Sequence, residues 1–177
     1  MMPQNAQGLT RLEYLRFRNS YLPRHQKLIF ILESPPKSGL YFYRPDGLVS
    51  EPLFRAMMKD VLEIDPKTKD EGLREFAARG YLLIDATYSP VNHPHLPDKE
   101  RNALILADLT TLVDDLRKHT NPGTKLVLVK ANICRLFDTR LTDLGFAVLN
   151  RGKTIPFPST GQQNKFRAAV RLVLGSL

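Results

Sequence analysis

Short apolar runs recur along the chain and are separated by longer amphipathic segments. The runs consist mainly of Leu, Ile, Val and Phe, and each has the length of a buried strand. We predict strands at residues 27–32, 81–84, 125–130 and 146–149. The second run ends in a carboxylate, Asp85.

The segments between these runs carry apolar residues at helical spacing. We predict helices at residues 9–21, 50–64, 71–79, 98–119, 132–144 and 162–173. Ser50 is expected to cap the second helix and Asp98 the fourth, which is predicted to be one long helix. Strands that alternate with helices predict an α/β fold, in which three α/β/α layers are built around a four-stranded parallel sheet.

The length of 177 residues fits one domain, and no repeat or linker divides the chain. We expect a single domain over residues 1–177, with the basic helical segment of residues 1–26 packed on it. No apolar run approaches the roughly 20 residues of a membrane span, and the polar start lacks the apolar core of a secretion signal. We therefore expect a monomeric cytoplasmic protein without a membrane partner.

Positive charge is concentrated toward the carboxyl end. The formal net charge is +8, and residues 121–177 contain nine Lys and Arg against two Asp. This balance would attract a polyanion such as nucleic acid or an acidic membrane surface, although a solvated basic surface would have the same composition.

Cys134 is the one cysteine, so no disulfide or iron-sulfur site can form within the chain. His93 and His95 have no further Cys or His nearby, so we expect no metal.

Three segments follow predicted strands: residues 33–43, 85–92 and 155–166. Because ligands bind at the carboxyl ends of the strands in such sheets, we expect the three segments to converge on one edge. In the first, prolines and Gly39 would hold three consecutive aromatic rings, residues 41–43, at set angles. A flat ring there can stack on a base, although a strand that buries alternate rings would explain Tyr41 and Tyr43 equally well.

Taken in order, these segments resemble the uracil-DNA glycosylase superfamily over about residues 27–174. The family's first motif is Gly-Gln-Asp-Pro-Tyr or Gly-Glu-Ala-Pro-Gly, and residues 32–36, Leu-Glu-Ser-Pro-Pro, stand in its place. A Gly-Leu-x-Phe segment then supplies the phenylalanine that stacks on the extruded base, and residues 39–42 match it. The resemblance implies a uracil-DNA glycosylase-like fold and a base-binding role for Phe42, with Pro35 and Tyr43 beside it.

The family's next strand ends in a Leu-Leu-Asn-Thr-like motif whose asparagine reads the pyrimidine edge. Residues 83–87, Leu-Ile-Asp-Ala-Thr, place Asp85 at that position, where it would contact the base. An asparagine donates and accepts hydrogen bonds at once, whereas an ionised aspartate only accepts. Asp85 would therefore be protonated when buried, read a different base, or act as the base that activates water.

Two catalytic side chains of the family are replaced in this chain. Ser34 stands where one branch has a water-activating aspartate, and Ile155 where it has a transition-state histidine. Neither replacement can do the original task, and a missing donor beside the departing base removes about 3 kcal/mol of stabilisation. The catalytic candidates are Glu33, Ser34 and Asp85. Glu33 could orient or activate a water, or it could be a carboxylate paired with loop amides or a basic side chain.

The last segment is similar to the family's His-Pro-Ser-Pro motif, which presses on the minor groove and the phosphates. Its stiff backbone, its hydroxyls and the start of a helix can bind phosphate. Gln162 or Gln163 could fill the gap left by an extruded nucleotide, while Lys165 and Arg167 neutralise phosphates or form a solvated helix face. The predicted DNA-binding residues are Pro156, Phe157, Pro158, Ser159, Thr160, Gly161, Gln162, Gln163, Lys165 and Arg167.

These patterns support the hypothesis of a DNA-associated repair glycosylase. It would turn a uracil out of DNA and hydrolyse its N-glycosidic bond without a metal or organic cofactor. A second hypothesis is a binding module of the same fold that holds damaged or abasic DNA, or an RNA base. A third is a small-molecule hydrolase on an α/β sheet, against which the basic carboxyl-terminal third argues.

Overall fold

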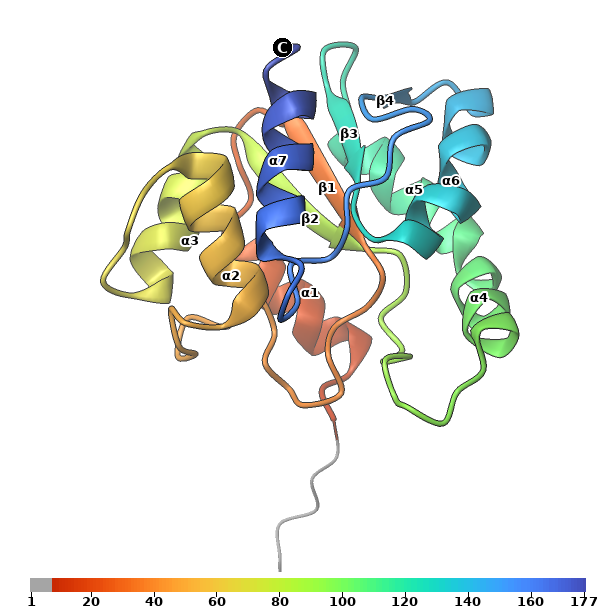
Figure 1. The fold of residues 1–177 in the computed structure, drawn as a ribbon, viewed down its shortest axis with the longest axis horizontal. Coiled ribbons are helices and arrows are strands. Elements are labelled where there is room, and N and C mark those ends of the chain that lie inside the picture. Colours follow the sequence, from red (N-terminus) through yellow and green to blue (C-terminus); the bar gives the residue numbers. More distant parts are fainter. Residues whose placement is uncertain (1–7) are drawn as a thin grey trace, which may run out of the picture.

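Four parallel strands form the central sheet of the computed structural model, which describes residues 8–177 (Figure 1). The strands are β1 (Leu28–Leu32), β2 (Tyr81–Asp85), β3 (Lys125–Leu128) and β4 (Ala147–Val148), in the spatial order β2-β1-β3-β4. β1 pairs with β2 on one side and β3 on the other, and all five of its residues are buried. Burial on both faces explains its uninterrupted apolar sequence. The predicted α/β fold is confirmed.

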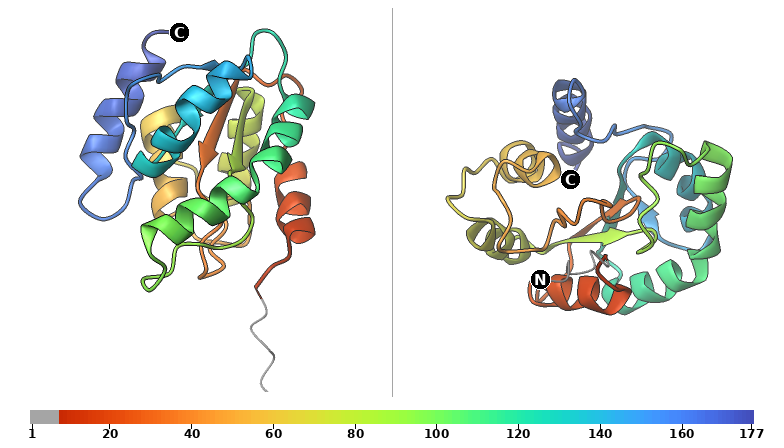
Figure 2. Two further views of the ribbon diagram at one scale, coloured as in Figure 1. Left: turned by 90° about the vertical axis from the view of Figure 1, so that its right-hand side faces the viewer. Right: turned by 90° about the horizontal axis from the view of Figure 1, so that it is seen from below.

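Helices cover both faces of the sheet, which confirms the predicted three layers (Figure 2). α1 (Arg11–Asn19) and α5 (Leu109–His119) lie on one face, and α6 (Ala131–Asp143) and α7 (Gln163–Leu174) lie on the other. The other helices of the described residues are α2 (Pro52–Ala56), the π-helix η1 (Met57–Leu62), α3 (Lys69–Ala78) and α4 (Asp98–Ala107). Within the predicted basic segment, α1 packs on the domain through the buried Tyr14 and Arg18, while residues 1–7 lie outside the described residues.

Two predicted helix starts are wrong, and one predicted helix is divided. Glu51, not Ser50, precedes α2, and its carboxylate accepts hydrogen bonds from the Leu48 amide (2.9 Å) and Lys69 Nζ (2.7 Å). Asp98 lies in the first turn of α4, because the preceding proline takes the cap position. The segment 98–119 breaks at Asp108, whose backbone leaves the helical region and whose carboxylate accepts a hydrogen bond of 2.5 Å from a threonine after β2.

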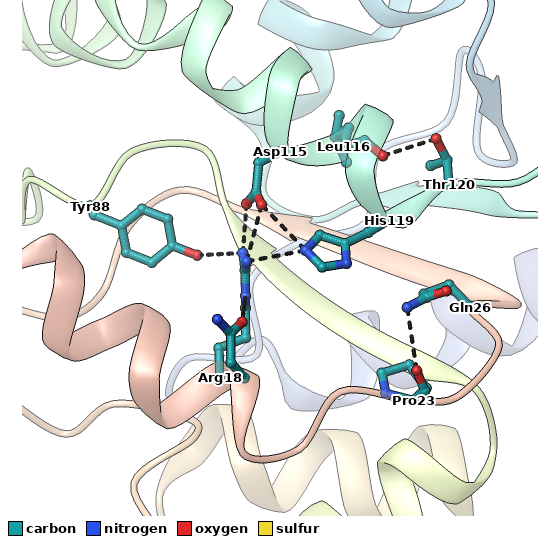
Figure 3. A network of polar contacts seen from close by, with 9 residues as sticks. Arg18, Pro23, Gln26, Tyr88, Asp115, Leu116, His119 and Thr120 are labelled. Carbon is teal, nitrogen blue, oxygen red and sulfur yellow. Dashed lines mark hydrogen bonds and ion pairs between the residues drawn. The ribbon is translucent and has the colours of Figure 1, made fainter.

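A buried ion pair ties α1 to α5 (Figure 3). Arg18, which is 2% exposed, donates to both carboxylate oxygens of Asp115, at 2.6 and 3.0 Å. It also donates to the Tyr88 hydroxyl at 3.1 Å, and His119 Nε2 lies 3.4 Å from its other terminal nitrogen. Because Tyr88 follows β2, this network fixes the loop that leaves the strand at Asp85.

The described helices are all too short or too polar to cross a lipid bilayer.

Candidate functional site

The loops at the carboxyl edge of the sheet enclose a cavity of about 280 Å³. Its wall comes from the loop after β1, the start of α2, the ends of β2 and β3, and Phe157 of the last loop. All three segments that the sequence predicted to converge contribute to it, with Glu33, Asn92 and Phe157 as examples. The cavity therefore lies where a parallel sheet places its ligands.

Aromatic rings form much of the cavity wall. Phe42 lines it, and edge-on contacts with the rings of Tyr43 and Phe76, at 4.9 and 5.3 Å between centroids, fix its orientation. Tyr41 and Phe54 line it as well. The described cavity lining does not include Tyr43, which is fully buried and accepts a hydrogen bond of 2.8 Å from the Leu83 amide. The base-binding position predicted for Tyr43 is thus corrected, since this ring packs in the core behind Phe42.

The pairing of β1 with β2 brings the two candidate carboxylates to the same place. Leu32 is in register with Asp85, so Glu33 follows immediately at the end of β1. Beyond the strands, the Ala86 amide donates to the Leu32 carbonyl at 2.8 Å. Glu33 and Asp85 both line the cavity as a result.

Asp85 is a buried carboxyl with an unused oxygen. Its residue is 5% exposed, and its Oδ2 has no hydrogen-bond partner among the described residues. Burial raises the pKa of Asp85 to about 7; the Arg18 guanidinium opposes the rise and the Glu33 carboxylate adds to it. Asp85 also lines a second cavity of about 260 Å³ beside α5. A buried polar atom without a partner is costly, so this oxygen favours a polar ligand.

Glu33 is held from two sides. Lys130 Nζ donates to its Oε1 at 2.7 Å, and Asn132 Nδ2 donates to its Oε2 at 2.5 Å. The Glu33 side chain is 6% exposed, while that of Lys130 is 31% exposed. Of the two interpretations offered for Glu33, the paired carboxylate is the one that the structure contains. Each oxygen nevertheless retains a lone pair for a further donor.

Lys130 has an unusual backbone for a residue with a side chain. Its φ is +88°, in the half of conformational space that favours glycine. Its amide donates to the Ile155 carbonyl at 2.8 Å, and its own carbonyl accepts from the Cys134 amide at 3.0 Å, at the start of α6. Strained backbone of this kind clusters at functional sites and costs on the order of 1–3 kcal/mol.

Sequence reasoning overlooked Lys130, Asn132 and Asn92. A signal existed for the first two, because Lys130 ends the third predicted strand and Asn132 follows it, just as Glu33 and Asp85 follow the first two. Asn92 Oδ1 accepts from the Lys37 amide at 2.9 Å and so joins the loops after β1 and β2. Ser34 has a similar role, because its hydroxyl accepts a 3.4 Å hydrogen bond from the Val91 amide. Pro35 and Ser34 both line the cavity.

Some residues of the last loop, residues 155–162, face the cavity or the core, and others face solvent. Phe157 lines the cavity and Pro158 is buried, whereas Ser159, Thr160 and Gly161 are exposed. Gly161 has a φ of +82°, and its amide donates to the Gln163 side chain at 2.9 Å. Pro156 and Gln162 are half-buried.

The two predicted phosphate-binding cations of α7 differ in their surroundings. Lys165 is exposed. Arg167 instead donates to Asp60 Oδ1 at 2.7 Å, and the Asp60 side chain is only 4% exposed. Its guanidinium thus neutralises a buried carboxylate of η1, while the side chain stays 35% exposed, and its predicted contact with a phosphate stays a prediction.

Within residues 8–177, no three His, Cys, Asp or Glu side chains come together as a metal site. Cys134 is buried.

Neither a protein-family model nor a curated protein matches this chain significantly.

Proposed function

We propose that the protein is a DNA glycosylase that takes a uracil base from DNA into the cavity and hydrolyses its N-glycosidic bond. One observation carries this proposal: an aromatic cavity at the carboxyl edge contains a buried carboxyl, Asp85, with an oxygen unpaired among residues 8–177. A flat ring with a polar edge complements both features. Chemistry on a base requires its extrusion into such a pocket.

The raised pKa of Asp85 supports the first of the three roles considered for it, that of a protonated carboxyl that contacts the base. With a pKa of about 7, a substantial fraction of this carboxyl is protonated near neutral pH. A protonated carboxyl carries one O–H donor and retains acceptor capacity. It can therefore donate to O4 of uracil and accept from N3–H, as an asparagine would. Phe42 would stack against the face of the same ring.

Glu33 is suited to act on the sugar side of the N-glycosidic bond. Lys130 and Asn132 hold its two oxygens in place, and each oxygen can still accept a hydrogen bond from a water. A fixed negative charge beside C1′ stabilises the positive charge that develops on the sugar as the base departs. We assign Glu33 to hold the attacking water and Asp85 to hold the base.

The exposed part of the last loop supports a DNA partner. Ser159 and Thr160 offer hydroxyls to phosphate oxygens, and the start of α7 adds amides and a positive dipole end. Lys165 supplies a charge that is exposed to solvent. The net charge of +8 would favour association with a polyanion at low salt.

A cleavage assay with defined oligonucleotides tests the proposal. End-labelled strands that carry one uracil, single-stranded or paired with G or A, are incubated with the protein and then treated with alkali. We expect a band at the uracil position that disappears in Asp85→Ala, while Asp114→Ala, on the exposed side of α5, retains it. Intact uracil strands at protein excess would overturn the proposal.

A second candidate is a binding module for damaged or abasic DNA. It is favoured by Ile155, which is fully buried and offers no donor where the resemblance places a histidine. Release of free base in a single turnover would exclude this candidate. Salt-sensitive, tight binding without any release would support it.

A further inference from the structure

We propose that Lys130 is a nucleophile that gives the protein a second activity, cleavage of DNA strands at abasic sites. In this activity Lys130 Nζ forms an imine with the C1′ aldehyde of an abasic deoxyribose, and the strand breaks by β-elimination. The inference rests on the proposed function only in placing DNA at this cavity. It does not require that the protein itself removes a base.

The position of Lys130 differs from that of Lys69, a buried lysine. Lys130 lines the cavity, and about a third of its side chain is exposed, so its amine can reach a bound ligand. Lys69 Nζ is enclosed by the Tyr41 carbonyl at 2.9 Å and the Glu51 carboxylate at 2.7 Å, and its side chain is 0% exposed. Lys69 is therefore a structural ion-pair partner. Lys130 also forms an ion pair, but its side chain lines the cavity.

The backbone holds the Lys130 amine in this place at an energetic cost. Its φ of +88° is retained by the hydrogen bonds to the Ile155 carbonyl and from the Cys134 amide. If residue 130 only had to connect β3 to α6, glycine would suit the position better, because glycine adopts this conformation without strain. A lysine here is better explained by what its side chain does in the cavity.

Glu33 completes the chemistry because it can exchange protons with this amine. Its Oε1 lies 2.7 Å from Lys130 Nζ, so a proton can pass between the two groups while the imine forms. Asn132 holds the other oxygen at 2.5 Å, so the carboxyl stays in place when the amine turns toward a ligand. Lysine amines form imines with carbonyl substrates, and Glu33 is the group placed to relay the protons.

The reaction needs no oxidant or external reductant. Glu33 accepts one ammonium proton as the Nζ lone pair adds to the aldehyde carbon C1′, and a second Nζ proton moves to the oxygen, which gives a carbinolamine. Glu33 returns its proton to this hydroxyl, which leaves as water and produces the C1′=Nζ iminium. Glu33 then removes a proton from C2′; this electron pair forms the C2′=C3′ bond, and the 3′ phosphate leaves with the C3′–O bonding pair. One water hydrolyses the imine, which restores the amine and releases an unsaturated aldehyde on the 5′ fragment.

The first experiment uses an oligonucleotide with a preformed abasic site and the full chain. Sodium borohydride reduces an imine to a stable amine, so we expect a covalent protein–DNA product on a denaturing gel. Without borohydride we expect a strand break that needs no alkali. Peptide mass spectrometry of the trapped product should place the adduct on Lys130, and an adduct on any other residue would overturn the proposal.

Variants separate the nucleophile from the base. Lys130→Arg keeps the positive charge beside Glu33 but cannot form the imine, so trapping should be lost. Glu33→Gln should form the trapped product more slowly but should still form it, whereas its strand cleavage should slow by about 10²–10³-fold for want of a general base. Lys118→Arg, an exposed position on α5, should behave as the parent protein. If Lys130→Arg fails to fold, as judged by circular dichroism, the mapped adduct of the parent protein decides the question.

Failure of this inference is distinguishable from failure of the proposed function. Release of uracil without trapping on a preformed abasic site would overturn the Lys130 activity alone. Trapping on Lys130 without release of uracil would support it and overturn the uracil glycosylase. Neither release nor trapping would overturn both.

Discussion

The backbone amide of Thr87 donates a 3.1 Å hydrogen bond to the carbonyl oxygen of Glu33, so the pairing of β1 and β2 continues past the last residues of both strands. This contact keeps Glu33 beside Asp85, and the charge of Glu33 contributes to the raised pKa of Asp85. The main chain therefore couples the two carboxylates: Glu33 is held by one lysine and one asparagine, and Asp85 is left in an apolar wall.

Asp85 should make stability depend on pH. Its pKa is about 7 in the folded protein and about 3.9 in an unfolded chain, so the folded state binds more protons between these values. Its contribution to the free energy of unfolding should fall as pH rises from about 4 to about 7, by roughly 4 kcal/mol. Asp85→Asn should remove this pH dependence. The free energy of unfolding of the variant, relative to that of the parent protein, should therefore increase as pH rises from about 4 to about 7. Urea unfolding at pH 5 and pH 8 measures the difference; an equal advantage at both values would contradict the assignment.

The same residue should set the pH dependence of uracil release. If the protonated carboxyl reads the base, the single-turnover rate should fall about tenfold for each pH unit above 7, because only the protonated fraction is active. Asp85→Asn keeps a donor and an acceptor at every pH and should flatten this limb. A decline that persists unchanged in Asp85→Asn would assign it to another group.

Phe42 should contribute to base capture as well as to packing. Phe42→Leu should lower the affinity for uracil-containing DNA by about tenfold, since stacking on a base is worth roughly 1–3 kcal/mol. Phe76→Leu is the matched control, because Phe76 touches Phe42 but is outside the described cavity lining. Both variants should lose roughly 1–2 kcal/mol of stability. Equal affinities of the two variants, measured by gel shift against undamaged DNA, would remove Phe42 from the site.

Two substitutions of Lys130 should reveal the strain in its backbone. Lys130→Gly and Lys130→Ala lose the same ion pair to Glu33, yet only glycine adopts a φ of +88° freely. The glycine variant should therefore be the more stable of the two by about 1 kcal/mol or more. At Asp114, an exposed position in the middle of α5, the order should reverse, because glycine destabilises a helix interior by about 1 kcal/mol. Chemical denaturation of the four variants measures both differences.

Lys165 and Arg167 should differ although both lie on α7 near the last loop. Arg167→Ala leaves the buried Asp60 carboxylate without its ion pair and should cost roughly 1–3 kcal/mol of stability. Lys165→Ala should change stability by less than about 0.5 kcal/mol. It should instead lower the dependence of log affinity for DNA on log salt by about 1. The opposite assignment of the two effects would identify Arg167, and not Lys165, as the phosphate-binding residue.

The elements of the fold could be predicted because their signals are local. β1 and β2 are apolar runs whose boundaries agree with the predicted ones within a residue, and the helix predicted at residues 132–144 is α6 shifted by one residue. The break at Asp108 could not be predicted, since the apolar positions continue across it and the hydroxyl that donates to the Asp108 carboxylate belongs to Thr87, in another loop.

The candidate site was predictable in part for the same reason. Glu33 and Asp85 were found because each follows an apolar run, and the parallel order of strands brings such positions to one edge. The burial of Tyr43, the ion pair of Arg167 with Asp60 and the partners of Glu33 each join residues that are distant in sequence.

The sequence alone determined the α/β fold, the edge of the sheet that carries the loops, and the presence of two carboxylates and an aromatic segment there. Only the tertiary structure decided that Lys130 and Asn132 hold Glu33 while Asp85 retains an unpaired oxygen. The physical reason is that periodicity reports which residues are buried, whereas a pKa or an ion pair depends on which distant side chain comes within hydrogen-bond distance once the sheet has formed.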